Sequence, residues 1–244
     1  MLNIDNLSVS VNKKNILDKI SLCIHPGELH VLMGPNGSGK SSLAMTLLGH
    51  PLYKVLGGTV QLADNNLLNM PMHERAKLGL FVSFQNPVEF EGISVQSFLK
   101  IAYENMHGKL TSILEFRELL QQKAVDIGLK PELLLRSLNQ GFSGGEKKRL
   151  ELLQLAVLKP RFAILDELDS GLDMDALKHI AQHIHTLQKQ CSLGILFITH
   201  YPRMLKVLEL TKLHVMVSGK VVATGGKQLA QELEEKGFAP YLKT

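Results

Sequence analysis

The chain has 244 residues, of which 45% are hydrophobic and 20% charged, as is typical of a globular domain with a substantial apolar core. No stretch approaches the roughly 18 apolar residues of a membrane-spanning helix, and the first residues lack the pattern of a secretory signal, so we expect no direct membrane insertion. The net charge of +4 is spread over interspersed acidic and basic residues, so nucleic acid is not indicated as a partner. Two distant cysteines, Cys23 and Cys191, exclude a disulfide framework and favour a reduced, cytoplasmic setting.

The first 85 residues predict several strands and one helix. Short apolar or alternating segments predict strands, and leucines at helical spacing predict a helix. The predicted strands are residues 2–11, 30–33, 59–62 and 80–84, and the predicted helix is 42–48. Beyond residue 86 the pattern becomes helical, with helices predicted at 94–103, 112–127 and 132–138.

The alternating pattern returns after residue 141. Helices are predicted at 146–158 and 175–190, and strands at 162–165, 193–199, 214–218 and 220–223, the last two as a hairpin around Gly219. Strands that alternate with helices predict an α/β sheet, and the helical block predicts an insertion within it. We therefore expect a single domain over 1–244, with a catalytic α/β core at 1–85 and 158–244 and a helical subdomain at 86–157.

A complete phosphate-binding motif, Gly34-Pro-Asn-Gly-Ser-Gly-Lys-Ser41, follows a predicted strand and opens a predicted helix. Its glycines let backbone N–H groups turn toward an anion, and the helix N-terminus adds partial positive charge. Lys40 is expected to reach the β- and γ-phosphates, and the Ser41 hydroxyl to bind Mg²⁺. The predicted nucleotide contacts of this loop are Gly34, Pro35, Asn36, Gly37, Ser38, Gly39, Lys40, Ser41 and Ser42.

Two carboxylates, Asp166 and Glu167, follow the predicted buried strand at 162–165. Parallel-sheet proteins place ligands at the carboxyl ends of strands. Asp166 is therefore expected to hold Mg²⁺, directly or through water, and Glu167 to polarise an attacking water. An isolated Asp-Glu pair is more often a helix cap or a solvated turn, but the phosphate-binding motif upstream favours the catalytic interpretation.

The segment Gly141-Phe-Ser-Gly-Gly-Glu146 resembles the signature motif of ABC-type ATPases. The phosphate loop, Gln85, this segment, the acidic pair, Asp173 and His200 also follow one another in that family's order. The resemblance implies an α/β P-loop NTPase fold of the ABC type, with a mainly parallel sheet core, an antiparallel β subdomain and an inserted helical subdomain. It also implies ATP hydrolysis with ATP and Mg²⁺ as cofactors.

The resemblance assigns further roles to single residues. Gln85 would be a ligand of Mg²⁺ or water that senses the γ-phosphate, and His200 would hydrogen-bond the γ-phosphate or the attacking water, so both join Glu167 as catalytic residues. Across a transient, ATP-dependent head-to-tail homodimer, each chain would contribute residues to the ATP held by the other. These residues are Ser143, Gly144, Gly145 and Asp173. Taken alone, Ser143 and Glu146 predict only a capping box.

The sequence departs from the common family pattern at three positions. Phe142 and Glu146 stand where Leu and Gln are usual, and we expect Glu146 to turn back to its own helix as a capping-box member. The early strands lack the aromatic residue on which the family usually stacks adenine, and Val11 lies near that position. Because base stacking contributes about 1–3 kcal/mol, a modest nucleotide affinity is expected.

The segment at 165–178, LDELDSGLDMDALK, is similar to that of the ATPase subunits of the SUF iron–sulfur cluster assembly system. This similarity implies two related scaffold partners, SufB-like and SufD-like. Two alternatives stay open: the nucleotide-binding subunit of an ABC transporter, and a non-catalytic module that only dimerises on ATP. His179 and His183 have the spacing of a helical metal pair, but no third ligand is apparent and a solvated helix face is expected.

Overall fold

The computed structural model describes residues 1–85 and 87–242. Asn86, where the helical insertion is predicted to begin, and residues 243–244 lie outside the described residues. Among the described residues, no helix is both long enough and apolar enough to cross a membrane.

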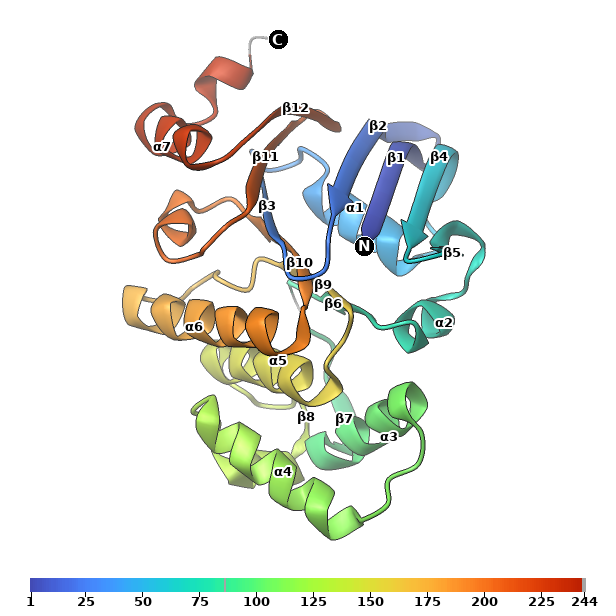
Figure 1. Ribbon diagram of the computed structural model, residues 1–244, viewed down its shortest axis with the longest axis vertical. Helices are drawn as coiled ribbons and strands as arrows, with labels where there is room; N and C mark the ends of the chain where they lie inside the picture. Colours follow the sequence, from blue (N-terminus) through green and yellow to red (C-terminus); the bar gives the residue numbers. More distant parts are fainter. Residues whose placement is uncertain (86, 243–244) are drawn as a thin grey trace.

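A six-stranded sheet of order β12-β11-β3-β10-β9-β6 forms the centre of the molecule (Figure 1). Its strands are β3 (Leu29–Met33), β6 (Leu80–Ser83), β9 (Phe162–Asp166), β10 (Gly194–Thr199), β11 (Lys212–Val217) and β12 (Lys220–Gly225). All pairs are parallel except β11 with β12, which form the predicted hairpin around Gly219. The parallel order aligns the carboxyl ends of β3, β6, β9 and β10 at one edge of the sheet.

The buried central strands divide their side chains between two apolar cores. In β10, Ile195 and Phe197 belong to one core, whereas Leu196 and Ile198 belong to the other. The helix α1 (Lys40–Leu48) packs in the second core, and α5 (Gly144–Leu158) and α6 (Met174–Cys191) pack in the first. Burial on both faces explains why these strands are continuous apolar runs in the sequence.

An antiparallel sheet of order β2-β1-β4-β5 covers α1 from the other side (Figure 1). Its strands are β1 (Leu2–Val11), β2 (Lys14–Ile24), β4 (Lys54–Leu62) and β5 (Asn65–Asn66). The sequence analysis missed β2. An irregularity at Lys19, with φ of 51°, places two residues between the buried Leu17 and Ile20 and breaks the alternation by which a strand is recognised.

Helices α3 (Val95–His107) and α4 (Ile113–Asp126) confirm two predicted helices of the insertion. The predicted helix at 132–138 is wrong. A 3₁₀ helix, η2 (Pro131–Leu135), ends at the extended residue Arg136, and β8 (Ser137–Leu138) then pairs with β7 (Phe90–Ser94). Pairing with a distant strand overrides the local helical preference of this leucine-rich segment.

Short elements complete the chain. They are α2 (Met72–Lys77), α7 (Lys227–Lys236) and the 3₁₀ helices η1 (Leu67–Asn69), η3 (Pro202–Lys206) and η4 (Ala239–Tyr241). The guanidinium of Arg75 in α2 is buried and donates to the carbonyls of Thr46 and Leu47 at 2.9 and 2.7 Å. This contact satisfies carbonyl groups at the C-terminus of α1, whose N-terminus carries the phosphate-binding motif.

Candidate active site

The turn between β3 and α1 contains the predicted phosphate loop and depends on glycine at several positions. A Cβ atom on Gly34 would lie 2.1 Å from the carbonyl oxygen of Met216, so only glycine allows this approach to β11. Gly37 and Gly39 have φ of 76° and 109°, in the region that favours glycine. The Gly219 N–H donates to the Ser38 carbonyl at 2.8 Å and ties the loop to the β11–β12 hairpin.

The ammonium group of Lys40 lies inside this loop. It donates to the carbonyl oxygens of Gly34 at 2.9 Å and Pro35 at 3.0 Å. Burial lowers the pKa of Lys40, and the carboxylates of Glu167 and Asp166 oppose that shift. The loop therefore holds a cation beside two carboxylates, in the place where the motif predicts contact with phosphate.

Asp166 ends β9 and is buried beside α1. Its N–H donates to the Ser83 hydroxyl at 3.0 Å, which links the ends of β9 and β6. Burial raises the pKa of Asp166, and the Ser41 side chain, which interacts with the carboxyl group, opposes this shift. The Oδ1 atom of Asp166 is buried without a hydrogen-bond partner among the described residues. An unpartnered carboxylate oxygen beside a serine hydroxyl is a donor set that suits Mg²⁺.

Glu167 is held on both sides by the other two predicted catalytic residues. Gln85 Nε2 donates to Glu167 Oε2 at 2.5 Å, and His200 Nδ1 lies 2.8 Å from Glu167 Oε1. The three residues follow β6, β9 and β10, whose carboxyl ends lie side by side in the sheet. Residues more than 30 positions apart are thus brought into direct contact.

The backbone of Glu167 is also constrained. Its φ of 53° is unusual for a residue other than glycine and is the kind of strain found at functional sites. Three hydrogen bonds hold this conformation: the Glu167 N–H donates to Ile198 O at 2.9 Å, and the Glu167 carbonyl accepts from Lys148 Nζ at 2.8 Å and from the Ser170 N–H at 3.1 Å. The hydrogen bonds to the Glu167 backbone therefore orient its carboxylate, in addition to the contacts with Gln85 and His200.

A cavity of about 480 Å³ joins the loop to these catalytic residues. It is lined by Ile16, Asn36, Gly37, Gly39, Lys40, Ser41, Ser42, Gln85, Glu167 and His200. Ile16 was missed because it belongs to β2, the strand that the sequence analysis did not find. Val11, near which the family's aromatic is expected, is not among the lining residues.

Other supporting residues also escaped the sequence analysis. Thr199 Oγ1 donates to the buried Asp169 Oδ2 at 2.6 Å and accepts the Tyr201 N–H at 2.9 Å, so both neighbours of His200 are fixed. Burial raises the pKa of Asp169, and the hydrogen bond from Thr199 opposes that shift. The only sequence signal for these residues was their closeness to Glu167 and His200. Lys148 gave no such signal, because it lies in a run of three basic residues (Lys147, Lys148 and Arg149), a pattern typical of a solvated helix face.

The predicted capping box at the start of α5 is confirmed. Glu146 Oε2 accepts the Ser143 N–H at 2.8 Å, and Ser143 Oγ accepts the Glu146 N–H at 3.3 Å. The hydrogen bond from the Ser143 N–H lowers the pKa of Glu146. Glu146 thus turns back to its own helix as expected, while Ser143 and Gly144 remain exposed to solvent.

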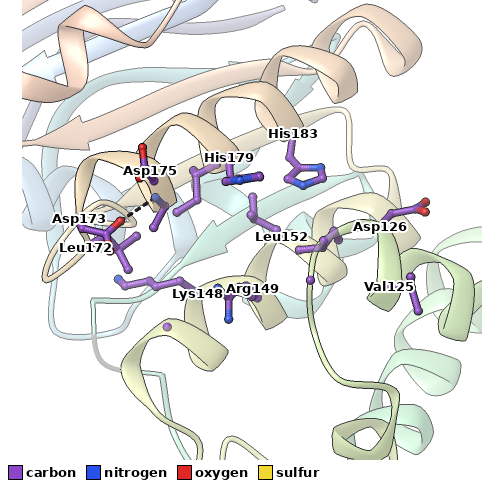
Figure 2. A pocket seen from close by; sticks show the side chains of 15 residues that line it. Val125, Asp126, Lys148, Arg149, Leu152, Leu172, Asp173, Asp175, His179 and His183 are labelled. Carbon is purple, nitrogen blue, oxygen red and sulfur yellow. Dashed lines mark hydrogen bonds between the residues drawn. The ribbon is translucent and has the colours of Figure 1, made fainter.

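A second cavity, of about 520 Å³, lies between α4, α5 and α6 and contains the remaining predicted contacts (Figure 2). Gly145 and Asp173 lie on its wall, and Asp173 caps α6 by accepting the Ala176 N–H at 2.8 Å. His179 and His183 line the same cavity, and no group of three or more His, Cys, Asp or Glu suited to a metal occurs in the described part of the chain. The predicted residues thus fall into two separate groups within one chain.

Comparison with known proteins defines the class. The family model described as "ABC transporter" matches residues 17–170. The chain belongs to this family of ATP-binding cassette proteins, and it is an ATPase. The family and the α/β fold expected from the sequence are confirmed.

Curated relatives match the chain over nearly its whole length. It is 45% identical to "Probable ATP-dependent transporter SufC" of Escherichia coli, covering 98% of this chain and 97% of the relative. It is 46% identical to "Probable ATP-dependent transporter slr0075" of Synechocystis, covering 98% and 94%. It is 43% identical to "Vegetative protein 296" of Bacillus subtilis, covering 97% and 91%.

Solved structures share the fold at lower sequence identity. The "ATP binding subunit of ABC transporter" superposes with a TM-score of 0.79 at 24% identity and covers 97% of this chain and 93% of that one. A dimeric post-hydrolysis state of the ATP-binding cassette MJ0796, bound to ADP and Pi, also superposes with a TM-score of 0.79. Its identity is 18%, and the match covers 93% of this chain and 98% of that one. These likenesses establish the architecture of the ATP-binding cassette.

Proposed function

We propose that this ATPase is the ATP-hydrolysing subunit of a cytoplasmic SUF iron–sulfur cluster assembly complex. The single observation that carries hydrolysis is the Glu167 carboxylate, held between Gln85 and His200 on the wall of the phosphate-loop cavity. The assembly role is supported by the segment at 165–178 and by 45% identity to a relative named SufC. In this proposal residues 86–157 form the helical subdomain of a single ATPase domain.

In the hydrolytic step, Glu167 accepts a hydrogen bond from the attacking water and polarises it. The loop N–H groups and Lys40 hold the β- and γ-phosphates, which requires Lys40 to exchange the carbonyls of Gly34 and Pro35 for phosphate oxygens. Ser41, Gln85 and Asp166 would hold Mg²⁺, which when bound neutralises charge on the phosphates. His200 stays against Glu167 and donates toward the γ-phosphate or the water.

The exposed N-terminus of α5 supports the proposal of an ATP-driven dimer. Ser143 and Gly144 face solvent and do not line the phosphate-loop cavity of their own chain. The 15-residue helix α5 has a solvent-exposed N-terminus, and the partial positive charge of such an end favours a nearby anion. Head-to-tail pairing would place this end, together with Asp173, against the ATP of a second chain and close two sites at once.

The segment after Gln85 is the proposed contact with the SufB-like and SufD-like scaffolds. Val88, Phe90 and Ile93 are 64%, 47% and 43% exposed, and Ile101 of α3 is also exposed. Apolar side chains gathered in this way often mark a protein interface. Because the segment continues from a catalytic residue, a change at the nucleotide could move the scaffold.

Copurification with hydrolysis measurements tests the assembly role. We would coexpress the chain with a SufB-like and SufD-like pair and measure both complex formation and ATPase stimulation. Phe90→Ser and Ile93→Ser should weaken the complex, whereas Leu114→Ser and Leu119→Ser on the exposed surface of α4 serve as matched controls. If only the two control variants weakened complex formation, the proposed contact surface would be contradicted.

The second candidate function is the nucleotide-binding subunit of an ABC transporter. The names of several relatives contain the word transporter, which favours testing this candidate directly. Retrieval of a membrane permease, with no stimulation by the scaffold pair, would support this candidate. The ATP site would be the same in both cases.

A further inference from the structure

Three metal-ligating side chains meet at the end of the antiparallel sheet where β1 begins and β2 ends. Cys23 Sγ lies 3.9 Å from Met1 Sδ and 3.8 Å from His25 Nε2. The strand register brings them together, because Leu2 pairs with Ile24 and Asn3 with Cys23. None of the three residues lines the phosphate-loop cavity.

These separations fit a trigonal metal centre. Metal–sulfur bonds of about 2.3 Å and metal–nitrogen bonds of about 2.0 Å, spread at 120°, require about 4.0 Å between two sulfur ligands and about 3.7 Å between sulfur and nitrogen, each within about 0.1 Å of the distance observed from Cys23 Sγ. The observed distances from Cys23 Sγ agree with both values. The thiol of Cys23 is therefore spaced from each of the other two donors as a shared ion would require.

The donor types select the ion. A thiolate and a thioether are soft ligands that favour Cu(I), and imidazole is also a good copper ligand. Zn²⁺ generally takes four ligands and rarely uses methionine. The site is therefore suited to a soft monovalent cation.

The backbone around the three donors is well anchored. The Met1 carbonyl accepts the Ala63 N–H at 2.9 Å. The His25 N–H donates to Glu28 Oε2 at 2.8 Å, and the Glu28 N–H donates to the His25 carbonyl at 3.1 Å. These two hydrogen bonds close the turn after β2. Met1 and His25 are exposed and Cys23 is half-buried, so solvent ions can reach the sulfur atoms.

We propose that Met1, Cys23 and His25 bind one Cu(I) ion through the thioether, the thiolate and the imidazole. Binding replaces the proton of the Cys23 thiol, so one proton is released for each ion and copper stays in the Cu(I) state. The second cysteine provides an internal control, because Cys191 lies on the wall of a cavity that Met1 also lines but has no contact with the Cys23 sulfur among the described hydrogen bonds.

The test is anaerobic competition for Cu(I) between the full chain and a chromophoric chelator. The wild-type chain and Cys191→Ser should each bind one equivalent with equal affinity. Cys23→Ser and His25→Asn should bind about 100-fold more weakly or worse, since even outer-shell changes cost 10–100-fold. Unchanged ATP hydrolysis in all three variants would show that they are folded.

X-ray absorption at the copper edge tests the remaining ligand. Protein grown with selenomethionine should show one copper–selenium distance beside one sulfur and one nitrogen. Wild-type affinity in Cys23→Ser, equal loss in Cys191→Ser, or absence of copper–selenium scattering would each overturn the proposed site.

Discussion

In the proposed mechanism, hydrolysis depends on the placement of one carboxylate, that of Glu167. Its side chain contacts Gln85 and His200, and its carbonyl contacts the buried Lys148. A general base in this position typically contributes about 10²–10⁴-fold to the rate. We expect nucleotide binding, by contrast, to depend on the loop and on Lys40, whose hydrogen bonds are to loop residues and not to Glu167.

Replacing Glu167 with Gln should therefore separate hydrolysis from binding. We expect phosphate release to fall by about 10²–10⁴-fold, because the amide cannot accept the proton of the attacking water. The dissociation constant for ATP should stay close to that of the wild-type chain. Lys40→Ala is the contrasting variant, because it should lose binding and hydrolysis together. Equal ATP affinity losses in the two variants would contradict the division of roles.

A pair of buried histidines predicts the acid sensitivity of the fold. His214 Nε2 lies 3.0 Å from His30 Nδ1, and His214 Nδ1 lies 2.9 Å from the Thr224 hydroxyl. Burial lowers the pKa of His214 to about 4. Since the unfolded chain has a pKa near 6.5, it binds more protons than the folded chain as pH falls below 6.5, and the free energy of unfolding decreases.

Urea unfolding between pH 7 and pH 5 should show this effect. The His214 shift alone should cost about 2 kcal/mol at pH 5 and about 3 kcal/mol by pH 4. His214→Gln should be less stable at pH 7 but should depend less on pH over this range. Parallel curves for the two proteins would show that another group is responsible.

At the scale of single elements, α5 connects the exposed segment that resembles the family signature to Glu167, the proposed catalytic residue. Its first turn is closed by the capping box of Ser143 and Glu146, and one turn later Lys148 donates to the Glu167 carbonyl. The N-terminal end of α5 is therefore exposed to solvent, where a partner chain can reach it, while Lys148 on one face of the helix is hydrogen-bonded to Glu167. Glu146, which departs from the family pattern, caps the N-terminus of its own helix.

Variants of Glu146 test this interpretation. Glu146→Ala removes the acceptor for the Ser143 N–H and the negative charge near the helix N-terminus, so it should cost about 0.5 kcal/mol in the free energy of unfolding. Glu146→Gln keeps an acceptor and should cost less. If Gln lowered stability as much as Ala, the charge rather than the hydrogen bond would be the main contribution.

At the scale of the whole molecule, the predicted nucleotide contacts lie in two groups on separate surfaces of one chain, which we propose are two half-sites. The phosphate-loop cavity is lined by Lys40 and by the predicted catalytic residues, whereas Ser143 is exposed and Gly145 and Asp173 line the other cavity. A head-to-tail pair would complete each half-site with the other. This arrangement makes a mixing experiment decisive.

Two inactive variants should restore activity when mixed. Lys40→Ala removes the phosphate contact of the loop, and Ser143→Arg places a bulky side chain in the signature segment. Neither variant should therefore hydrolyse ATP alone. In the mixed pair, the intact loop of the Ser143→Arg chain faces the intact signature of the Lys40→Ala chain. We expect measurable phosphate release from the mixture and none from either variant. A mixture as inactive as its components would contradict complementation between chains.

Much of the site could be predicted because its requirements are local. The phosphate loop needs glycines at set positions between a strand and a helix, and Ser143 with Glu146 defines a helix start within four residues. Where the pattern was interrupted, prediction failed. The irregularity at Lys19 concealed β2, and strand pairing of Ser137 and Leu138 replaced a predicted helix.

The sequence by itself determined the phosphate loop, the acidic pair, the capping box of Ser143 and Glu146 and the alternation of buried strands with helices, because each depends on neighbouring residues. Only the tertiary structure decided that Gln85, Glu167 and His200 touch, since that contact follows from the order of three parallel strands. It also decided that Ile16 lines the cavity and that Ser143 lies outside it. These are contacts between distant segments, for which a short stretch of sequence carries no signal.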